Sequence, residues 1–157
     1  WSQPQTAYTA PSGIPKALGT MTRLRTGGLI TPFLDDQLVR ILASNDDGKT
    51  WQASDPIDCA PLQLPVPYGR ILEYKGELLM PLYGKLALGG KLAPCSGFLR
   101  SKDAAKSWER FSVIACDRQS AEIEYGPTAI HADPNGHLLA MISPNGLRSS
   151  SAARVWS

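Results

Sequence analysis

The feature that most constrains the fold of this chain is a repeat of about fifty residues, marked by tryptophan. The four tryptophans, Trp1, Trp51, Trp108 and Trp156, are separated by 50, 57 and 48 residues. Repeats of this length indicate arrays in which each unit buries its apolar face only against its neighbours. The sequence therefore predicts three repeats, approximately residues 1–51, 52–108 and 109–157.

Each internal tryptophan ends an eight-residue motif. The copy at 44–51 reads SNDDGKTW, the copy at 101–108 reads SKDAAKSW, and the copy at 149–156 keeps only the serine and the tryptophan. Asp46 is suited to accept hydrogen bonds from backbone amides that follow it, and Gly48 allows the positive φ of a tight turn. We expect a β-hairpin turn with structural aspartates at 46 and 103, and a Trp51 ring that packs between neighbouring repeats.

Turn glycines and apolar segments predict four short antiparallel strands in each repeat. Gly28, Gly76 and Gly136 each open an apolar segment at an equivalent place. Strand-like segments precede the glycine at 20–25, 70–74 and 128–132. Others precede the tryptophan motif at 38–43, 97–100 and 146–148, and one follows it at 111–116. The stretch 84–94 is predicted to be the longest loop between strands.

Composition excludes several classes of function. Sixteen basic and fourteen acidic residues are interspersed and give a net charge of only +2, so no basic stripe indicates a nucleic-acid partner. No apolar run approaches the roughly 20 residues that span a bilayer. The fourteen glycines and thirteen prolines leave little room for a long helix.

The cysteines and histidines indicate no metal or cofactor site. The three cysteines lack CxxC spacing, which predicts no zinc site and at most one disulfide. Cys59 and Cys116 both follow a motif tryptophan by eight residues, so we expect them at equivalent core positions, too far apart to bond each other. We expect solvent-facing side chains at His131 and His137, and a solvated turn at 35–36.

The motif at 44–51 resembles the Asp box of the sialidase-like (BNR repeat) β-propeller family. The segments 67–71 with 76–83, and 127–130 with 135–142, are similar to the same family. The resemblance covers essentially the whole chain. It implies an all-β fold. It also implies that residues 1–157 form a single partial propeller domain built of four-stranded antiparallel blades.

The family resemblance also implies an incomplete ring. Sialidases of the family have six blades, so about three blades make half of a propeller. Because an open half-ring exposes strand edges and blade faces, we expect either an excerpt of a longer chain or a homodimer that closes the propeller. A secreted or periplasmic location follows from the family alone.

Candidate site residues lie where inner strands begin, at the mouth expected for a propeller channel. Arg70 offers a planar fork of donors for an anionic ligand, with a surface ion pair as the alternative. Tyr68 and Tyr125, like Tyr83, are suited to stack on sugar rings or simply to pack between blades. The resemblance makes Glu124 the candidate catalytic residue, the glutamate that helps a tyrosine nucleophile lose its proton. Its alternative is a solvated charge, like Glu122.

The function implied by the resemblance is a glycoside hydrolase relative that acts on or recognises terminal sugars of glycans. One arginine of the family's carboxylate clamp would fall at Ser143, so the catalytic set is incomplete in this chain. The alternatives are a non-catalytic glycan- or protein-binding propeller, and a divergent relative without a ligand site.

Overall fold

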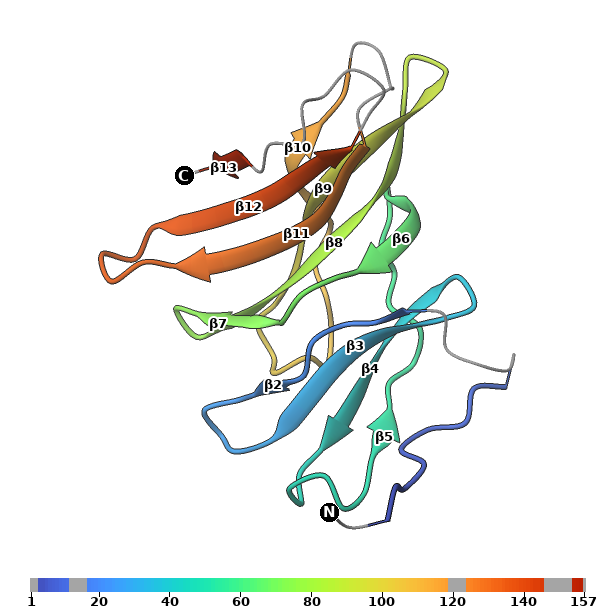
Figure 1. Cartoon of the computed structure of the whole chain (residues 1–157), viewed down its shortest axis with the longest axis vertical. Helices are drawn as coiled ribbons and strands as arrows, with labels where there is room; N and C mark the ends of the chain where they lie inside the picture. Colours follow the sequence, from blue (N-terminus) through green and yellow to red (C-terminus); the bar gives the residue numbers. More distant parts are fainter. Residues whose placement is uncertain (1–2, 12–16, 119–123, 146–153, 157) are drawn as a thin grey trace.

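The computed structural model describes residues 3–11, 17–118, 124–145 and 154–156. Within these ranges the chain forms thirteen strands and no helix. The strands make three antiparallel sheets, none closed into a barrel, which follow one another along the long axis of the molecule (Figure 1). The prediction of an all-β fold is confirmed.

The first sheet contains the hairpin that surrounds Asp36. Its strands are β1 (Ala17–Leu18), β2 (Thr22–Arg23), β3 (Leu29–Asp35), β4 (Leu38–Ser44) and β5 (Gln52–Ala53). Their order is β1-β3-β4-β5, and β2 also pairs with β3. Asp36 adopts a φ of 57°, which turns the chain tightly between β3 and β4.

The second sheet repeats this order with longer strands. It comprises β6 (Gln63–Pro67), β7 (Leu72–Tyr74), β8 (Glu77–Leu88), β9 (Lys91–Ser101) and β10 (Ser112–Cys116), in the order β10-β9-β8-β6 with β7 also on β8. The loop predicted at 84–94 is wrong, because β8 and β9 continue through it to a two-residue turn at Gly89 and Gly90. Leu86 and Ala93 are buried in this extension, and both glycines have positive φ.

The third sheet contains β11 (Glu124–Ala132), β12 (Leu138–Asn145) and β13 (Arg154–Trp156). The strand predicted at 146–148, Trp1 and Glu122 lie outside the described residues. The first two sheets end one strand beyond the tryptophans that divide the sequence, since β5 follows Trp51 and β10 follows Trp108.

The core lies on both faces of β8. Met80 and Leu82 point into the main cluster, which joins the first two sheets, while Leu79 belongs to a second cluster with Ile130 and Ala140 of the third sheet. Successive side chains of a strand point to opposite faces, so one apolar strand buries itself against two neighbouring sheets.

Successive sheets are joined by direct hydrogen bonds. Thr20 forms a parallel bridge with Arg70, and its N–H donates to the Gly69 carbonyl at 2.9 Å. The Tyr74 hydroxyl donates to the Gly136 carbonyl at 2.6 Å, which links the second sheet to the third. Accordingly β2, β7 and β11 lie on the same side of the molecule (Figure 1).

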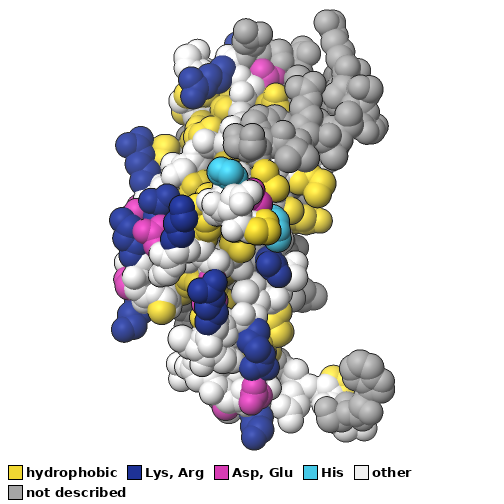
Figure 2. All heavy atoms as spheres, turned by 90° about the vertical axis from the view of Figure 1, so that its left-hand side faces the viewer, with side chains coloured by type: hydrophobic (Ala, Val, Ile, Leu, Met, Phe, Trp, Pro, Cys, Tyr) yellow, Lys and Arg dark blue, Asp and Glu magenta, His cyan; other side chains and the backbone are white. Residues whose placement is uncertain are grey.

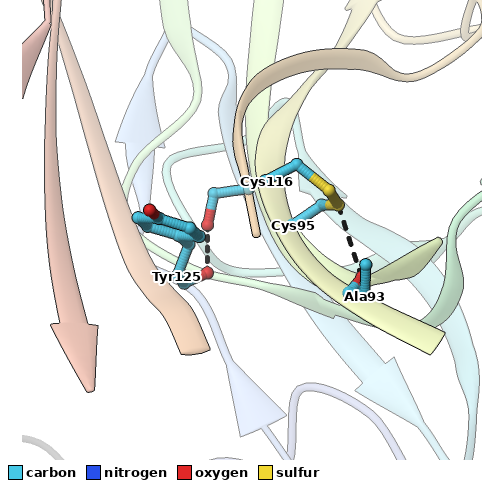
Figure 3. Close-up of a disulfide and its surroundings, with 5 residues drawn as sticks. Ala93, Cys95, Cys116 and Tyr125 are labelled. Carbon is cyan, nitrogen blue, oxygen red and sulfur yellow. Dashed lines mark hydrogen bonds between the residues drawn. A yellow bond between two sulfur atoms is a disulfide. The ribbon is translucent and has the colours of Figure 1, made fainter. Parts of the chain in front are cut away.

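One disulfide fastens the outer strand of the second sheet. Cys95 of β9 is bonded to Cys116 of β10, directly opposite in the register (Figure 3). Cys59 is free and buried, and burial raises the pKa of its thiol to about 12. The predictions of at most one disulfide, and of no bond between Cys59 and Cys116, are confirmed.

The predicted solvated turn at 35–36 is wrong for Asp35. Its side chain is buried, Arg40 Nε lies 3.3 Å from Oδ2, and the Tyr8 hydroxyl donates to the same oxygen at 3.1 Å. Tyr8 also packs edge-on against Phe33, with ring centroids 5.0 Å apart. Asp35 is buried because the N-terminal segment covers this side of β3, which a turn signal alone does not reveal.

Two Asp boxes form the turns that lead into β5 and β10. Asp46 accepts hydrogen bonds from the hydroxyl and N–H of Thr50, at 2.6 and 2.9 Å, and from the Ser44 hydroxyl at 2.8 Å. Asp103 makes the same contacts with Ser107 and Ser101. These hydrogen bonds, above all those from the residue at the Thr50 position, lower the pKa of each carboxyl to about 2. The predicted structural role of both aspartates is confirmed.

The two box tryptophans pack differently. The Trp108 side chain packs against the main core cluster. Trp51 instead lies over its own turn, where its Nε1–H donates to the Gly48 carbonyl at 3.0 Å. The expectation that Trp51 packs between repeats is therefore not met in the first box.

The second box contains a residue with a strained backbone, and a glycine in its place should remove the strain. Gly48 has a φ of 86°, and Ala105 occupies the equivalent position with a φ of 70°. The left-handed region costs a residue with a Cβ about 1–2 kcal/mol, partly offset by the greater freedom of glycine in the unfolded chain. We expect Ala105→Gly to raise the free energy of unfolding by about 0.5–1 kcal/mol in a urea titration.

Gly48→Ala is the matched control. The added Cβ would meet Leu29 and Trp51 at 3.6 Å, an ordinary contact, so backbone strain is the main effect. We expect a loss of about 1 kcal/mol. A loss of stability in Ala105→Gly would contradict this account of the two turns.

Candidate functional site

Tyr125, the second residue of β11, lies between two hollows on the second and third sheets. The first, here called the tyrosine cleft, has a volume of about 100 Å³. Strands β6, β8, β9 and β11 supply its lining, which is Leu64, Tyr83, Gly84, Lys85, Pro94, Tyr125 and Gly126. The second, here called the arginine hollow, measures about 360 Å³ and places Arg118 beside the same tyrosine.

Close backbone packing shapes the tyrosine cleft. A Cβ on Gly84 would lie 2.7 Å from the Gln63 carbonyl, so only glycine allows β6 and β8 to approach there. The register of β6 shifts between Gln63 and Val66, and within this bulge Leu64 has a φ of 50° and is 52% exposed. Bulges of this kind aim side chains at a particular place beside a sheet.

The backbone of Tyr125 is held from the second sheet. The Ser96 hydroxyl of β9 donates to the Tyr125 carbonyl, and Tyr125 lies beside the Cys95–Cys116 disulfide (Figure 3). Gly126, the next residue, places no side chain in the cleft. A Cβ built on Gly126 would lie 4.0 Å from the Tyr83 ring. Tyr125 is therefore fixed in position while its half-buried side chain remains within reach of a ligand.

Each of the two hollows is lined by one cationic side chain. Lys85 lines the tyrosine cleft and Arg118 lines the arginine hollow, while neither lining contains an acidic residue of the described part of the chain. Ammonium and guanidinium groups bind carboxylates through charge-assisted hydrogen bonds. Phenol rings add an apolar face with a polar tip. The arrangement suits a small polar ring that carries a negative charge.

Tyr83 lines this cleft with Tyr125, whereas Tyr68 and Arg70 do not line it. Tyr68 is 48% exposed and follows β6, with its N–H donating to the Pro81 carbonyl at 3.2 Å. Arg70 is exposed at the junction of the first and second sheets, where it bridges Thr20. Tyr125 lies at the junction of the second and third sheets, so the structure places Arg70 and Tyr125 at successive junctions.

Glu124 opens β11 opposite Asn145, and only its backbone belongs to the described structure. Ser143 is exposed on β12, directly opposite the cleft residue Gly126. The position at which the family resemblance requires an arginine is thus next to the tyrosine cleft and carries a hydroxyl group.

The histidines remain outside the site. His131 is exposed on β11, as expected. His137 is also exposed, but its Nδ1 lies 2.9 Å from Asp133 Oδ2, and this contact lowers the pKa of Asp133. No group of three or more metal-binding side chains occurs among the described residues. They also contain no helix of the length and apolar character that crossing a membrane requires.

Lys85 is the cleft residue that the sequence reasoning missed. It fell within the stretch predicted as a loop, where a lysine carries no particular meaning. The signal available in the sequence was the pair Gly89-Gly90 between two short apolar runs, at 86–88 and 92–94, which is typical of a β-hairpin. Reading it would have placed Lys85 on a strand that runs past Tyr83.

Comparison with known proteins supports the fold and is silent on function. No family model matches the chain, and no curated protein matches it. A crystal structure of a protein of unknown function from Dyadobacter fermentans DSM 18053 superimposes with a TM-score of 0.71 at 18% identity. The match covers 92% of this chain and 48% of that one, so this chain spans about half the length of its structural neighbour.

Proposed function

We propose that this protein recognises a terminal anionic sugar of a glycan through the tyrosine cleft. The observation that carries the proposal is the position of Tyr125, an anchored aromatic residue between a cleft with Lys85 and a hollow with Arg118. A sugar ring would stack on a tyrosine face, and its carboxylate would meet a cation. The resemblance of the Asp boxes to those of sialidase-like proteins supports the same class of ligand.

Binding without hydrolysis is the function we favour. Ser143 stands where the family resemblance requires a clamp arginine, and glycoside hydrolysis requires a correctly spaced pair of catalytic groups. The second candidate function is hydrolysis with Glu124 as the catalytic residue, favoured by its place directly before Tyr125. Turnover of a fluorogenic sialoside by the wild type, abolished in Glu124→Gln, would establish that alternative.

A lysine pair on the β8–β9 hairpin tests the binding proposal. Lys85 lines the cleft, whereas Lys91 lies at the start of β9, beyond the turn, and does not line it. Loss of one charge-assisted hydrogen bond costs about 1.5–3 kcal/mol. We expect Lys85→Met to weaken binding of a methyl sialoside at least about tenfold in calorimetry, and Lys91→Met to leave it unchanged. Equal effects of the two variants would contradict the proposed site.

We further propose that each sheet is one propeller blade. Three features support this: the repeated strand order, the packing of each sheet on the next, and the bridge between Thr20 and Arg70 that joins the first two sheets. A disulfide is typical of oxidising compartments, which supports a secreted or periplasmic location.

If each sheet is a blade, another blade packs against the outer face of the third sheet. Ala129 pairs with Met141 and His131 with Leu139 on that face, and Met141 is 53% exposed. Figure 2 shows hydrophobic side chains gathered beside the two histidines. A second copy of the chain, or further chain of the same protein, would cover them.

Solution mass distinguishes these two sources of the missing blades. If two copies close the ring, light scattering should give about twice the 17.0 kDa of one chain. Met141→Lys should then restore the single-chain mass, because it places a charge in the apolar contact. Leu92→Lys, at an exposed apolar residue of the second sheet, which has a sheet on either side, is the control. A single-chain mass for the wild type would exclude the homodimer.

A further inference from the structure

A hollow over the first Asp box forms a site separate from the tyrosine cleft. It measures about 790 Å³ and lies between the N-terminal segment 3–7 and the box residues 47–51. Figure 1 shows the start of the chain running beside the turn between β4 and β5. Pockets that bind small molecules have volumes of about 300–1,000 Å³. We call it the box hollow.

Trp51 gives the box hollow an aromatic wall of fixed orientation. Its Nε1–H is already donated to the Gly48 carbonyl at 3.0 Å, so the polar edge of the indole is occupied. The half-buried ring lies against Gly48, where an added Cβ would stand 3.6 Å from it. What Trp51 offers a ligand is therefore apolar aromatic surface. Trp108, the equivalent residue of the second box, packs against the main core instead.

The polar groups around Trp51 are mostly neutral. Gln3, Gln5 and Thr6 line the N-terminal wall, and their amides and hydroxyl both donate and accept hydrogen bonds. Thr50 already donates its hydroxyl proton to Asp46 at 2.6 Å, so it serves only as an acceptor.

The two charged residues of the lining are opposite in sign. Asp47 and Lys49 balance each other within the lining, and Arg23, which lies outside the lining, is 2.9 Å from Asp47. The lining itself therefore has no excess of either charge. This distinguishes it from the tyrosine cleft, whose lining has a lysine and no acid among the described residues.

We propose that the box hollow binds a neutral pyranose sugar, whose apolar face stacks on Trp51 while Gln3, Gln5 and Thr6 bond its hydroxyls. An aromatic wall with a few neutral donors and acceptors suits a ring with one apolar face and many hydroxyl groups. The inference stands independently of the proposed function, because it concerns another sheet, other residues and an uncharged ligand.

Signals of the indole N–H groups test the inference directly. Neutral methyl glycosides of glucose, galactose and mannose are titrated into the intact chain and followed by ¹H–¹⁵N NMR. We expect at least one of them to shift the Trp51 indole signal saturably and to leave the Trp108 signal in place. A methyl sialoside should not shift the Trp51 signal. Absence of a saturable shift with all three neutral sugars would overturn the proposal.

A variant outside the core protects the test from misfolding. Gln5 is exposed on the N-terminal segment, so Gln5→Ala should fold normally and weaken binding about tenfold through the lost hydrogen bonds. Trp51→Leu should abolish binding, and Trp108→Phe should leave it unchanged. Undiminished affinity in Gln5→Ala, or in a folded Trp51→Leu variant, would show that the sugar binds elsewhere and overturn the assignment.

Discussion

Gly97→Ala should destabilise this protein more than any other single methyl addition that we predict. Gly97 lies in β9 opposite Leu82 and Val113, and an ideal Cβ there would stand 1.9 Å from the Ser112 carbonyl oxygen and 2.7 Å from the Phe111 ring. The first of these atoms belongs to the backbone of β10, which the Cys95–Cys116 disulfide fastens to β9. The clash therefore cannot be relieved by a side-chain rotation.

We expect a loss of about 3 kcal/mol or more in the free energy of unfolding for Gly97→Ala. Gly126→Ala is the control, because the nearest atom to its ideal Cβ is 4.0 Å away and its φ is not positive. That variant should lose less than about 1 kcal/mol. Urea titrations followed by near-ultraviolet circular dichroism compare the two, and equal losses would contradict the packing described for β9 and β10.

The second large effect is expected for Arg40→Met. Asp35 and Arg40 are only 6% and 19% exposed, and Arg40 also donates to the Ser54 carbonyl at 2.8 Å. Methionine keeps much of the apolar bulk but removes the charge, so the buried carboxylate loses its main cation. Breaking one side of a buried ion pair costs about 3–5 kcal/mol, and we expect the lower part of this range because Arg40 is not fully buried.

An exposed pair on the same sheet provides the control. The Nη1 atom of Arg23 lies 2.9 Å from Oδ1 of Asp47, but the two side chains are 56% and 74% exposed. Arg23→Met should therefore cost less than about 1 kcal/mol. If Arg23→Met and Arg40→Met have equal thermal unfolding midpoints, the buried cluster of Tyr8, Asp35 and Arg40 does not stabilise the N-terminal segment as described.

Much of the fold could be predicted because local chemistry determines it. Turn glycines at 28, 76 and 136 mark hairpins, and the Asp boxes specify their own hydrogen bonds over eight residues. Contacts between segments far apart in the sequence could not be predicted in this way. Asp35 is buried only because Tyr8 comes to lie over Phe33, and no local pattern records that contact.

The candidate site was predicted in part for the same reason. Tyr125 was singled out from its position before an inner strand, and it does line a cleft. Its partner Lys85 comes from another sheet and lies in the stretch for which the sequence predicts a loop. Arg70 and Tyr125 are both predicted at the mouth of a propeller channel, and the structure places them at successive junctions between sheets. The roles proposed for Tyr68 and Glu124 stay predictions.

The most direct test of sugar recognition at the tyrosine cleft is a backbone amide NMR titration with a methyl sialoside. The account predicts saturable shifts concentrated at Tyr83, Gly84 and Lys85 of β8 and at Tyr125 and Gly126 of β11, with weaker changes at Ser143 opposite. Saturable shifts confined to other parts of the chain, or no shifts at all, would contradict the proposed function.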